Sequence, residues 1–181
     1  MGGNRRRGTL VGSDSVLHGT TDYSPLSHYH QGLPKTVVSA KPGDRFTLKE
    51  WYTIEATPTR HSDETTVGFK MHLNGGVVSY TSDTEYFDGL AEAHRDARIL
   101  IVCMTRPLQH RIPYHLSTED AAQLIAEVQP EFAIITHMGM KTIPRAAEQA
   151  TWIAEQTGIS TIAAKDGMRI YANDQIEVKR R

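Results

Sequence analysis

The feature that most constrains the fold of this chain is a set of apolar strand segments, each next to a residue able to bind a metal. Asp83 and His137 each follow such a segment, and His61 precedes one. Side chains at the ends of buried strands are held in place at the rim of a sheet, and imidazole and carboxylate groups are ligands that zinc and related ions prefer. We therefore expect these three residues to meet at one sheet edge and to bind metal. The three segments are residues 67–73, 77–81 and 132–136.

The composition is that of an ordinary globular protein. A chain of 181 residues, 39% hydrophobic and 23% charged, is long enough to bury one core. Its net charge of −1 gives no overall attraction to nucleic acid or to an anionic membrane. The single cysteine, Cys103, excludes an intrachain disulfide framework. No apolar stretch approaches the roughly 18 residues of a membrane span. We expect a soluble, cytoplasmic protein with no membrane segment.

The pattern of apolar residues predicts alternating strands and helices, and hence one α/β domain. A turn at residues 74–76, of sequence Asn-Gly-Gly, predicts a hairpin. Helices are predicted at residues 85–96, 117–128 and 144–157, and the second of these opens with a serine followed by acidic residues, which is typical of a helix start. Residues 13–34, rich in Ser, Gly and His, are predicted to form an irregular loop with room for one helical turn.

Four motifs in sequence order resemble those of the metallo-β-lactamase-fold hydrolases, nearest the RNase Z-like branch of tRNA 3′-processing endonucleases. The resemblance extends over residues 9–171. In that family a His before a Gly-aromatic strand is a metal ligand, which matches His61. The Asp of a Tyr-x-Ser-Asp-Thr strand end bridges two metals, which matches Asp83, and the His of an Ile-x-Thr-His motif is the last ligand, which matches His137. His115 resembles the residue that acts as a general acid in RNA-processing members.

The resemblance implies part of an αββα sandwich and a dinuclear zinc site that hydrolyses an ester or a phosphodiester. Asp83 and His115 would be its catalytic residues, the second protonating the leaving oxygen. The family's His-x-His-x-Asp-His motif, which supplies further ligands, does not occur in the sequence, and its nearest imitation, at residues 28–33, lacks the Asp and the last His. We expect residues 1–181 to form a single domain that is incomplete on its N-terminal side and poorly active alone.

Two functions remain open at this point. One is a hydrolase whose missing ligands lie outside this sequence, acting on a small ester, a phosphodiester or RNA. The other is a non-catalytic, truncated or degenerate domain that acts by associating with another chain. Either way we expect a homo-oligomer or a chain that supplies the missing half, because half of a sandwich leaves apolar sheet surface and strand edges uncovered.

Individual residues also have simpler interpretations. Asp83 is equally suited to cap a helix that begins at the next residue. His115 precedes a predicted helix, and its alternative role is a structural contact with the first turn of that helix. These alternatives predict different surroundings for each side chain, which the structure reveals.

Overall fold

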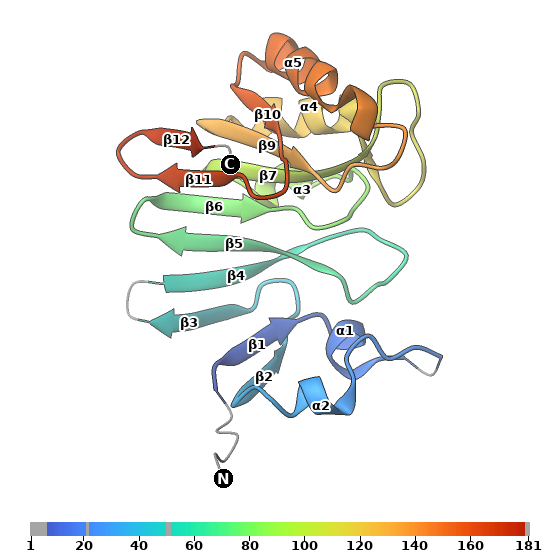
Figure 1. Cartoon of the computed structure of the whole chain (residues 1–181), viewed down its shortest axis with the longest axis vertical. Helices are drawn as coiled ribbons and strands as arrows, with labels where there is room; N and C mark the ends of the chain where they lie inside the picture. The colour runs from blue at the N-terminus through green and yellow to red at the C-terminus, as the bar shows by residue number, and fades with distance from the viewer. Residues whose placement is uncertain (1–6, 21, 50–51, 180–181) are drawn as a thin grey trace.

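A mixed eight-stranded sheet forms the centre of the computed structural model, which describes residues 7–20, 22–49 and 52–179 (Figure 1). Its strands are β3 (Arg45–Lys49), β4 (Tyr52–Pro58), β5 (Val67–Leu73), β6 (Gly76–Tyr80), β7 (Ala97–Arg106), β8 (Leu116–Ser117), β9 (Phe132–Thr136) and β10 (Thr161–Ala163). Their order is β10-β9-β7-β6-β5-β4-β3, with β8 paired to β7. Strands β3 to β6 are antiparallel, whereas β6, β7, β9 and β10 run parallel. The predicted α/β class is confirmed.

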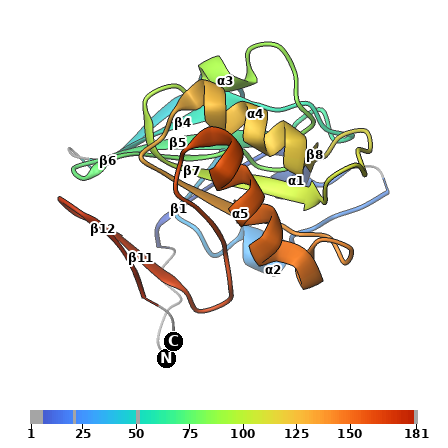
Figure 2. The same ribbon diagram turned by 90° about the horizontal axis from the view of Figure 1, so that it is seen from above.

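Helices and two small sheets surround this central sheet. The helices are α1 (Asp14–His18), α2 (His28–Gln31), α3 (Leu90–Ala93), α4 (Thr118–Val128), the 3-10 turn η1 (Ile143–Arg145) and α5 (Ala146–Thr157). The small sheets pair β1 (Thr9–Gly12) with β2 (Thr36–Ser39) and β11 (Arg169–Ala172) with β12 (Ile176–Lys179). Figure 2 shows α3 and α4 on one side of the central sheet and the β11–β12 hairpin on the other. Within the described ranges, no helix combines the length and the apolar character needed to cross a membrane.

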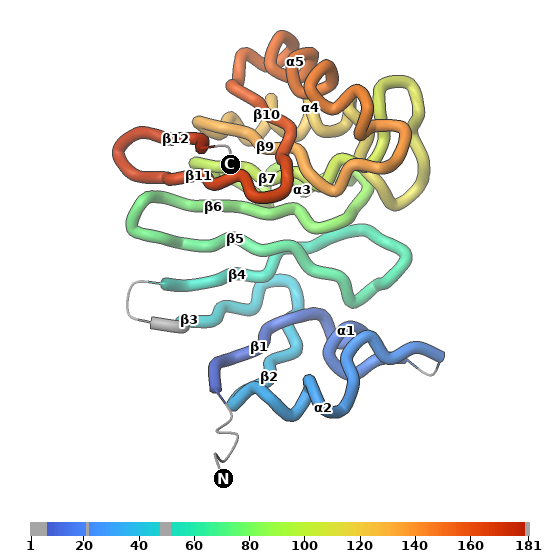
Figure 3. Tube along the Cα trace, in the orientation of Figure 1, coloured from blue at the N-terminus to red at the C-terminus, as the bar shows by residue number. Residues whose placement is uncertain are grey.

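The main core lies between the sheet and its helices. Because side chains alternate along a strand, Leu100, Val102 and Met104 of β7 all point to the same face, and all three are fully buried. There they join one apolar cluster with Leu124 of α4 and Ile153 of α5. The tube in Figure 3 shows that the N-terminal segment, drawn in blue, lies next to β3 at the far end of the sheet from these helices. The core is therefore concentrated at the β7–β10 end.

Two predicted elements differ from the structure. The helix predicted at residues 85–96 is wrong, because only Leu90–Ala93 is helical. The Thr84 hydroxyl, which accepts from the N–H of Arg60, instead donates at 2.9 Å to the carbonyl oxygen of Glu85, the group that a helix would bond to residue 89. The predicted loop at residues 13–34 contains two short helices rather than one turn. In the first case a contact distant in sequence overrides the local helix preference.

Candidate metal centre

Four segments bring His61, Asp83, His115 and His137 to one edge of the sheet. Strands β6 and β9 are parallel within this sheet, so the residues that follow them, leading to Asp83 and His137, lie at the same edge. The loop between β4 and β5, which carries His61, meets this edge because β5 starts beside the end of β6. His115 directly precedes β8, which pairs with the end of β7. The topology of the sheet therefore assembles the site.

The three histidine side chains converge on one carboxylate oxygen of Asp83. Oδ2 of Asp83 lies 3.0 Å from Nε2 of His137, 3.3 Å from Nε2 of His115 and 3.5 Å from Nε2 of His61. Ligand atoms of His61, Asp83 and His115 lie within 4.8 Å of one another. The predicted convergence of His61, Asp83 and His137 is confirmed, while their role as ligands stays a prediction. The structure adds His115 to the same cluster.

The surroundings of Asp83 fit a divalent cation. Its Oδ1 atom is buried and has no hydrogen-bond partner among the described residues. A buried carboxylate oxygen without a partner is costly, because the lost hydration is not replaced. Its Oδ2 atom faces three imidazole nitrogens, and this mixed nitrogen and oxygen donor set is one that zinc binds. An ion at this point would satisfy the carboxylate and the imidazoles together.

Thr84 and Glu85 connect three of the segments that carry the site. The N–H of Arg60 donates to Thr84 Oγ1 at 2.8 Å, and the N–H of Glu85 donates to the carbonyl oxygen of Arg60 at 3.0 Å. The N–H of Tyr114 donates to Glu85 Oε2 at 3.0 Å. The neighbours of His61, Asp83 and His115 are thus bonded to one another. Thr84 belongs to the Tyr-x-Ser-Asp-Thr motif, whereas the only signal for Glu85 is its position directly after that motif.

Asp63 ties the His61 loop to the N-terminal part of the chain. Its carboxylate accepts hydrogen bonds from the Ser15 hydroxyl of α1 and, at 2.9 Å, from the N–H of Thr65. Burial would raise the pKa of Asp63, but these hydrogen bonds outweigh burial and leave the pKa below its usual value. A charged, fully bonded Asp63 fixes the loop two residues after His61.

Unusual backbone conformations occur beside the site. The φ angles are +56° at His137, +59° at Ser82, next to Asp83, and +66° at Tyr114, next to His115. Residues other than glycine adopt this left-handed region at a cost of about 1–3 kcal/mol each, and such residues are concentrated at functional sites. Three of the segments that reach the cluster therefore do so through a strained residue, which sets the direction of the side chain.

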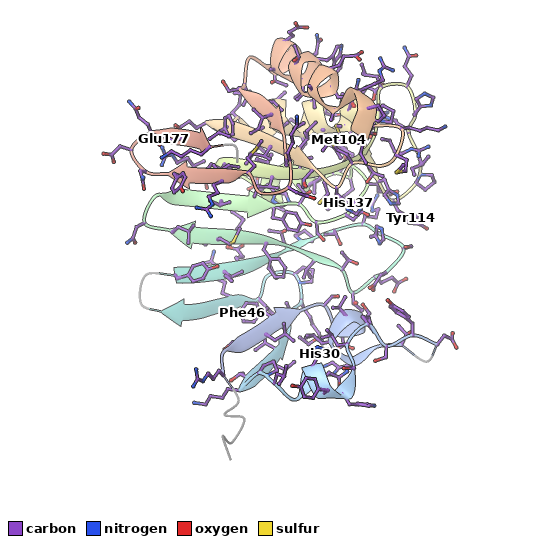
Figure 4. All side chains as sticks on the ribbon, viewed as in Figure 1. His30, Phe46, Met104, Tyr114, His137 and Glu177 are labelled. Carbon is purple, nitrogen blue, oxygen red and sulfur yellow. The ribbon has the colours of Figure 1, made fainter. Side chains whose placement is uncertain are left out.

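The structure also decides between the alternatives for Asp83 and for the histidines at residues 28–30. Asp83 is not a helix cap, because the next helix, α3, begins at Leu90 with Gly89 at its N-cap. His30 lies on α2, where its Nδ1 atom is 2.8 Å from Ser27 Oγ. Figure 4 shows His30 close to the N-terminal segment and well separated from His137. Residues 28–33, which partly match the missing motif, therefore do not contribute to this cluster.

Comparisons with known proteins agree with this architecture. A model of the β-lactamase superfamily domain matches residues 3–138. The uncharacterized protein MJ1374 of Methanocaldococcus jannaschii is 38% identical over 174 residues, which cover 94% of this chain and 64% of that protein. The metallo-β-lactamase-fold protein YhfI of Bacillus subtilis superposes with a TM-score of 0.72 at 16% identity, over 94% of this chain and 65% of that one. The chain thus spans just under two thirds of the length of both.

The predicted RNase Z-like branch receives weaker support than the fold. The short form of human tRNase Z superposes with a TM-score of 0.54 at 16% identity, over 77% of this chain and 50% of that protein. YhfI, which is not named as a tRNA-processing enzyme, superposes better. At such identities the likeness extends to the fold alone.

Proposed function

Because the chain belongs to the β-lactamase superfamily and has the metallo-β-lactamase fold, we propose that it is a metal-dependent hydrolase whose reaction takes place at the Asp83 centre. The observation that carries this proposal is the approach of three imidazole nitrogens to one oxygen of Asp83, whose other oxygen is buried without a partner. Zinc is the proposed metal, because it combines a preference for imidazole and carboxylate ligands with a tolerance of low coordination numbers.

The chemistry that follows is hydrolysis of an ester or a phosphodiester. A divalent cation held there would polarise a carbonyl or phosphoryl oxygen and would lower the pKa of water. Asp83 supplies the negative charge that attracts such a cation, and the surrounding hydrogen bonds keep its segment in place. A histidine that is open to solvent is suited to protonate the leaving oxygen. By resemblance His115 is the proposed acid, and its side chain is partly open to solvent, 26% exposed, with Nε2 3.3 Å from Asp83 Oδ2.

The test is an assay of the zinc-loaded chain with p-nitrophenyl acetate and bis-p-nitrophenyl phosphate. We expect slow turnover that depends on zinc, slow because the sequence lacks the family's His-x-His-x-Asp-His ligands. Asp83→Ala should lower this turnover at least about a hundredfold, since it removes the residue on which all three histidines converge. Asp88→Ala is the matched control, because Asp88 is an exposed carboxylate in the same segment.

Two results would contradict the proposal. One is zinc-dependent turnover that Asp83→Ala leaves intact. The other is tight zinc binding at Asp83 with no turnover of either substrate, which would favour the alternative of a non-catalytic domain that acts by association.

A further inference from the structure

We propose that Glu85 is a positioning residue, which holds His115 in the place from which it protonates the leaving group. The inference rests on the function proposed above and on the role that the family resemblance gives His115. In a phosphodiester reaction the proton passes to the leaving oxygen as the bond between that oxygen and phosphorus breaks, and a water oxygen forms the new bond to phosphorus. Glu85 acts on this step only through the position of the His115 ring.

One carboxylate oxygen of Glu85 binds the turn that carries His115. The N–H of Tyr114, directly before His115, donates to Glu85 Oε2 at 3.0 Å. This turn is closed on itself, because His115 forms a β-bridge with Ile112 and its Nδ1 atom lies 2.9 Å from the carbonyl oxygen of Pro113. The hydrogen bond to Glu85 therefore fixes the place of the turn together with the ring.

The backbone of Glu85 is itself held by hydrogen bonds. Its N–H donates to the carbonyl oxygen of Arg60 at 3.0 Å, and its own carbonyl oxygen accepts from the Thr84 hydroxyl at 2.9 Å. The second carboxylate oxygen, Oε1, lies 3.8 Å from Arg60 Nη1. Glu85 is thus bonded through its N–H, its carbonyl group and its side chain, and a residue fixed in this way is able to hold a neighbouring turn in place.

Glu85 also closes a short ring of residues that contains the site. The chain runs from Asp83 to Glu85, crosses by the hydrogen bond to Tyr114 and continues to His115. The Nε2 atom of His115 then lies 3.3 Å from Asp83 Oδ2, where the ring closes. Because so few residues make up this ring, the length of the Glu85 side chain sets the distance between His115 and Asp83.

The hydrogen bond from Glu85 is made at the strained residue of the turn. Tyr114 has a φ of +66°, which costs a residue other than glycine about 1–3 kcal/mol. The loop is also held at other positions, by the 2.7 Å ion pair of Arg111 with Asp120 and by the pairing of β8 with β7. Figure 4 shows Tyr114 and His137 at the same edge of the sheet. Loss of the bond to Glu85 should allow Tyr114 to relax and to carry the ring away from Asp83.

Two substitutions of Glu85 separate the hydrogen bond from the charge. Glu85→Gln removes the negative charge but keeps an oxygen that is able to accept from Tyr114, whereas Glu85→Met removes both at a similar side-chain length. Glu64→Met is the matched control, because it removes an exposed carboxylate three residues after His61. Thermal melts establish that each variant is folded, and Glu85→Ala replaces Glu85→Met if the latter is not.

The first measurements need no turnover and use the full chain without metal. In Glu85→Met, amide hydrogen exchange at Tyr114 should become at least about tenfold faster, because its N–H has lost its partner. The NMR signal of the His115 ring, identified by its absence from the spectrum of His115→Gln, should shift. Glu85→Gln and Glu64→Met should match the unaltered chain in both measurements.

Turnover by the zinc-loaded chain then tests the role of the ring. Diphenyl phosphate has a more basic leaving group than bis-p-nitrophenyl phosphate, so its hydrolysis depends more on an acid. We expect Glu85→Met to lower kcat at least about tenfold for diphenyl phosphate and about twofold or less for the nitrophenyl ester, with KM unchanged. A general loss of structure would lower both alike. Glu85→Gln should retain most of the turnover of both.

Three results would overturn the proposal. One is an unchanged His115 signal and unchanged Tyr114 exchange in the folded Glu85→Met chain, another is a Glu85→Gln chain as impaired as Glu85→Met, and the third is an equal loss of turnover with the two substrates. An unaltered chain with no turnover contradicts the proposed function, and the exchange and NMR results then decide separately whether Glu85 positions the His115 ring.

Discussion

One buried residue, His94, binds a proton at a different pH in the folded and in the unfolded chain. Its side chain is fully buried at the end of α3, and its Nδ1 atom lies 2.6 Å from Ser79 Oγ. Its Nε2 atom has no partner within the described part of the chain. Burial, and to a smaller extent the positive charge of Lys70, lower the pKa of His94 from 6.5 to about 4. The folded chain therefore holds this ring neutral where the unfolded chain protonates it.

We expect the free energy of unfolding to fall as the pH is lowered. The unfolded chain binds a proton at His94 near pH 6.5 and the folded chain only near pH 4, so the stability is fully present above pH 6.5. The contribution of His94 to the free energy of unfolding, about 3 kcal/mol, should be lost between pH 6.5 and pH 4. Urea titrations of the metal-free chain from pH 7.5 to pH 4 measure this. In His94→Asn, whose side-chain oxygen is still able to accept from Ser79, most of that slope should disappear, leaving the part that carboxylates such as Asp63 contribute.

The matched control is His110→Asn, an exposed histidine whose replacement should leave the slope unchanged. A His94→Asn chain that loses stability on acidification as steeply as the unaltered chain would show that other groups are responsible.

At the metal centre, the sequence predicts which residues meet but not how each side chain is oriented. His61, Asp83 and His137 are recognisable because strand ends deliver side chains to a rim, and the structure brings them together. The orientation of His115 depends on the Pro113 carbonyl and on a left-handed Tyr114, neither of which has a sequence pattern. Which nitrogen of the His115 ring faces Asp83 is therefore known only from the structure.

Among the elements, the β11–β12 hairpin depends on one side chain of the central sheet. Arg98, at the start of β7, donates to the carbonyl oxygens of Gly75 at 2.7 Å and Asn173 at 2.5 Å, and its Nε atom donates to Glu131 at 2.7 Å. Gly75 permits this approach, because a Cβ atom there would lie 2.2 Å from the carbonyl oxygen of Ala172. The guanidinium thus joins the turn of the hairpin to the β5–β6 turn.

We expect Arg98→Ala to release the hairpin without unfolding the domain. The five bonds from the guanidinium to backbone and carboxylate oxygens would be lost, whereas the core under α4 and α5 does not include Arg98. Amide hydrogen exchange at residues 169–179 should become at least about tenfold faster, with little change in β7 and β9. Arg95→Ala, which removes a surface pair with Glu92, is the control and should leave the hairpin protected. Unchanged exchange in the hairpin would mean that other contacts hold it.

The contrast between two predicted helices shows which elements a sequence specifies. The helix predicted from residue 117 is confirmed, because Ser117 and Asp120 form a reciprocal capping box that needs only local contacts. The helix predicted at residues 85–96 is wrong because the carbonyl oxygen of Glu85 is bonded to the Thr84 hydroxyl, which is held by Arg60, far away in the sequence. Local signals predict an element well where no distant partner competes for its backbone.

Over the whole molecule, the two faces of the sheet differ. Helices α3, α4 and α5 cover one face, whereas the other has a hollow of about 250 Å³. The residues that line this hollow are Val11, Ile54, Phe69, Met71, Tyr80 and Ile101. These side chains are half-buried and make this part of the second face apolar.

The homo-oligomer expected from uncovered sheet surface stays a prediction, and if it uses this face, Met71→Glu should prevent self-association. A charge at this position would have to be buried in an apolar interface, which costs several kcal/mol. Sedimentation velocity over a range of concentrations measures the association. Tyr23→Glu alters an exposed aromatic residue that does not line the hollow and should behave as the unaltered chain does. An unaltered chain that sediments as a monomer at all concentrations would refute this expectation.

The segments that meet at Asp83 are far apart along the chain, and this has a consequence for folding. His61, Asp83 and His115 come from three separate connections, so no short peptide of this sequence brings them together. An ion held by all three would act as a branched cross-link, closing two loops at once and penalising every partly unfolded state in which one connection has come away. Metal occupancy would then determine how far the chain opens, as well as whether it reacts.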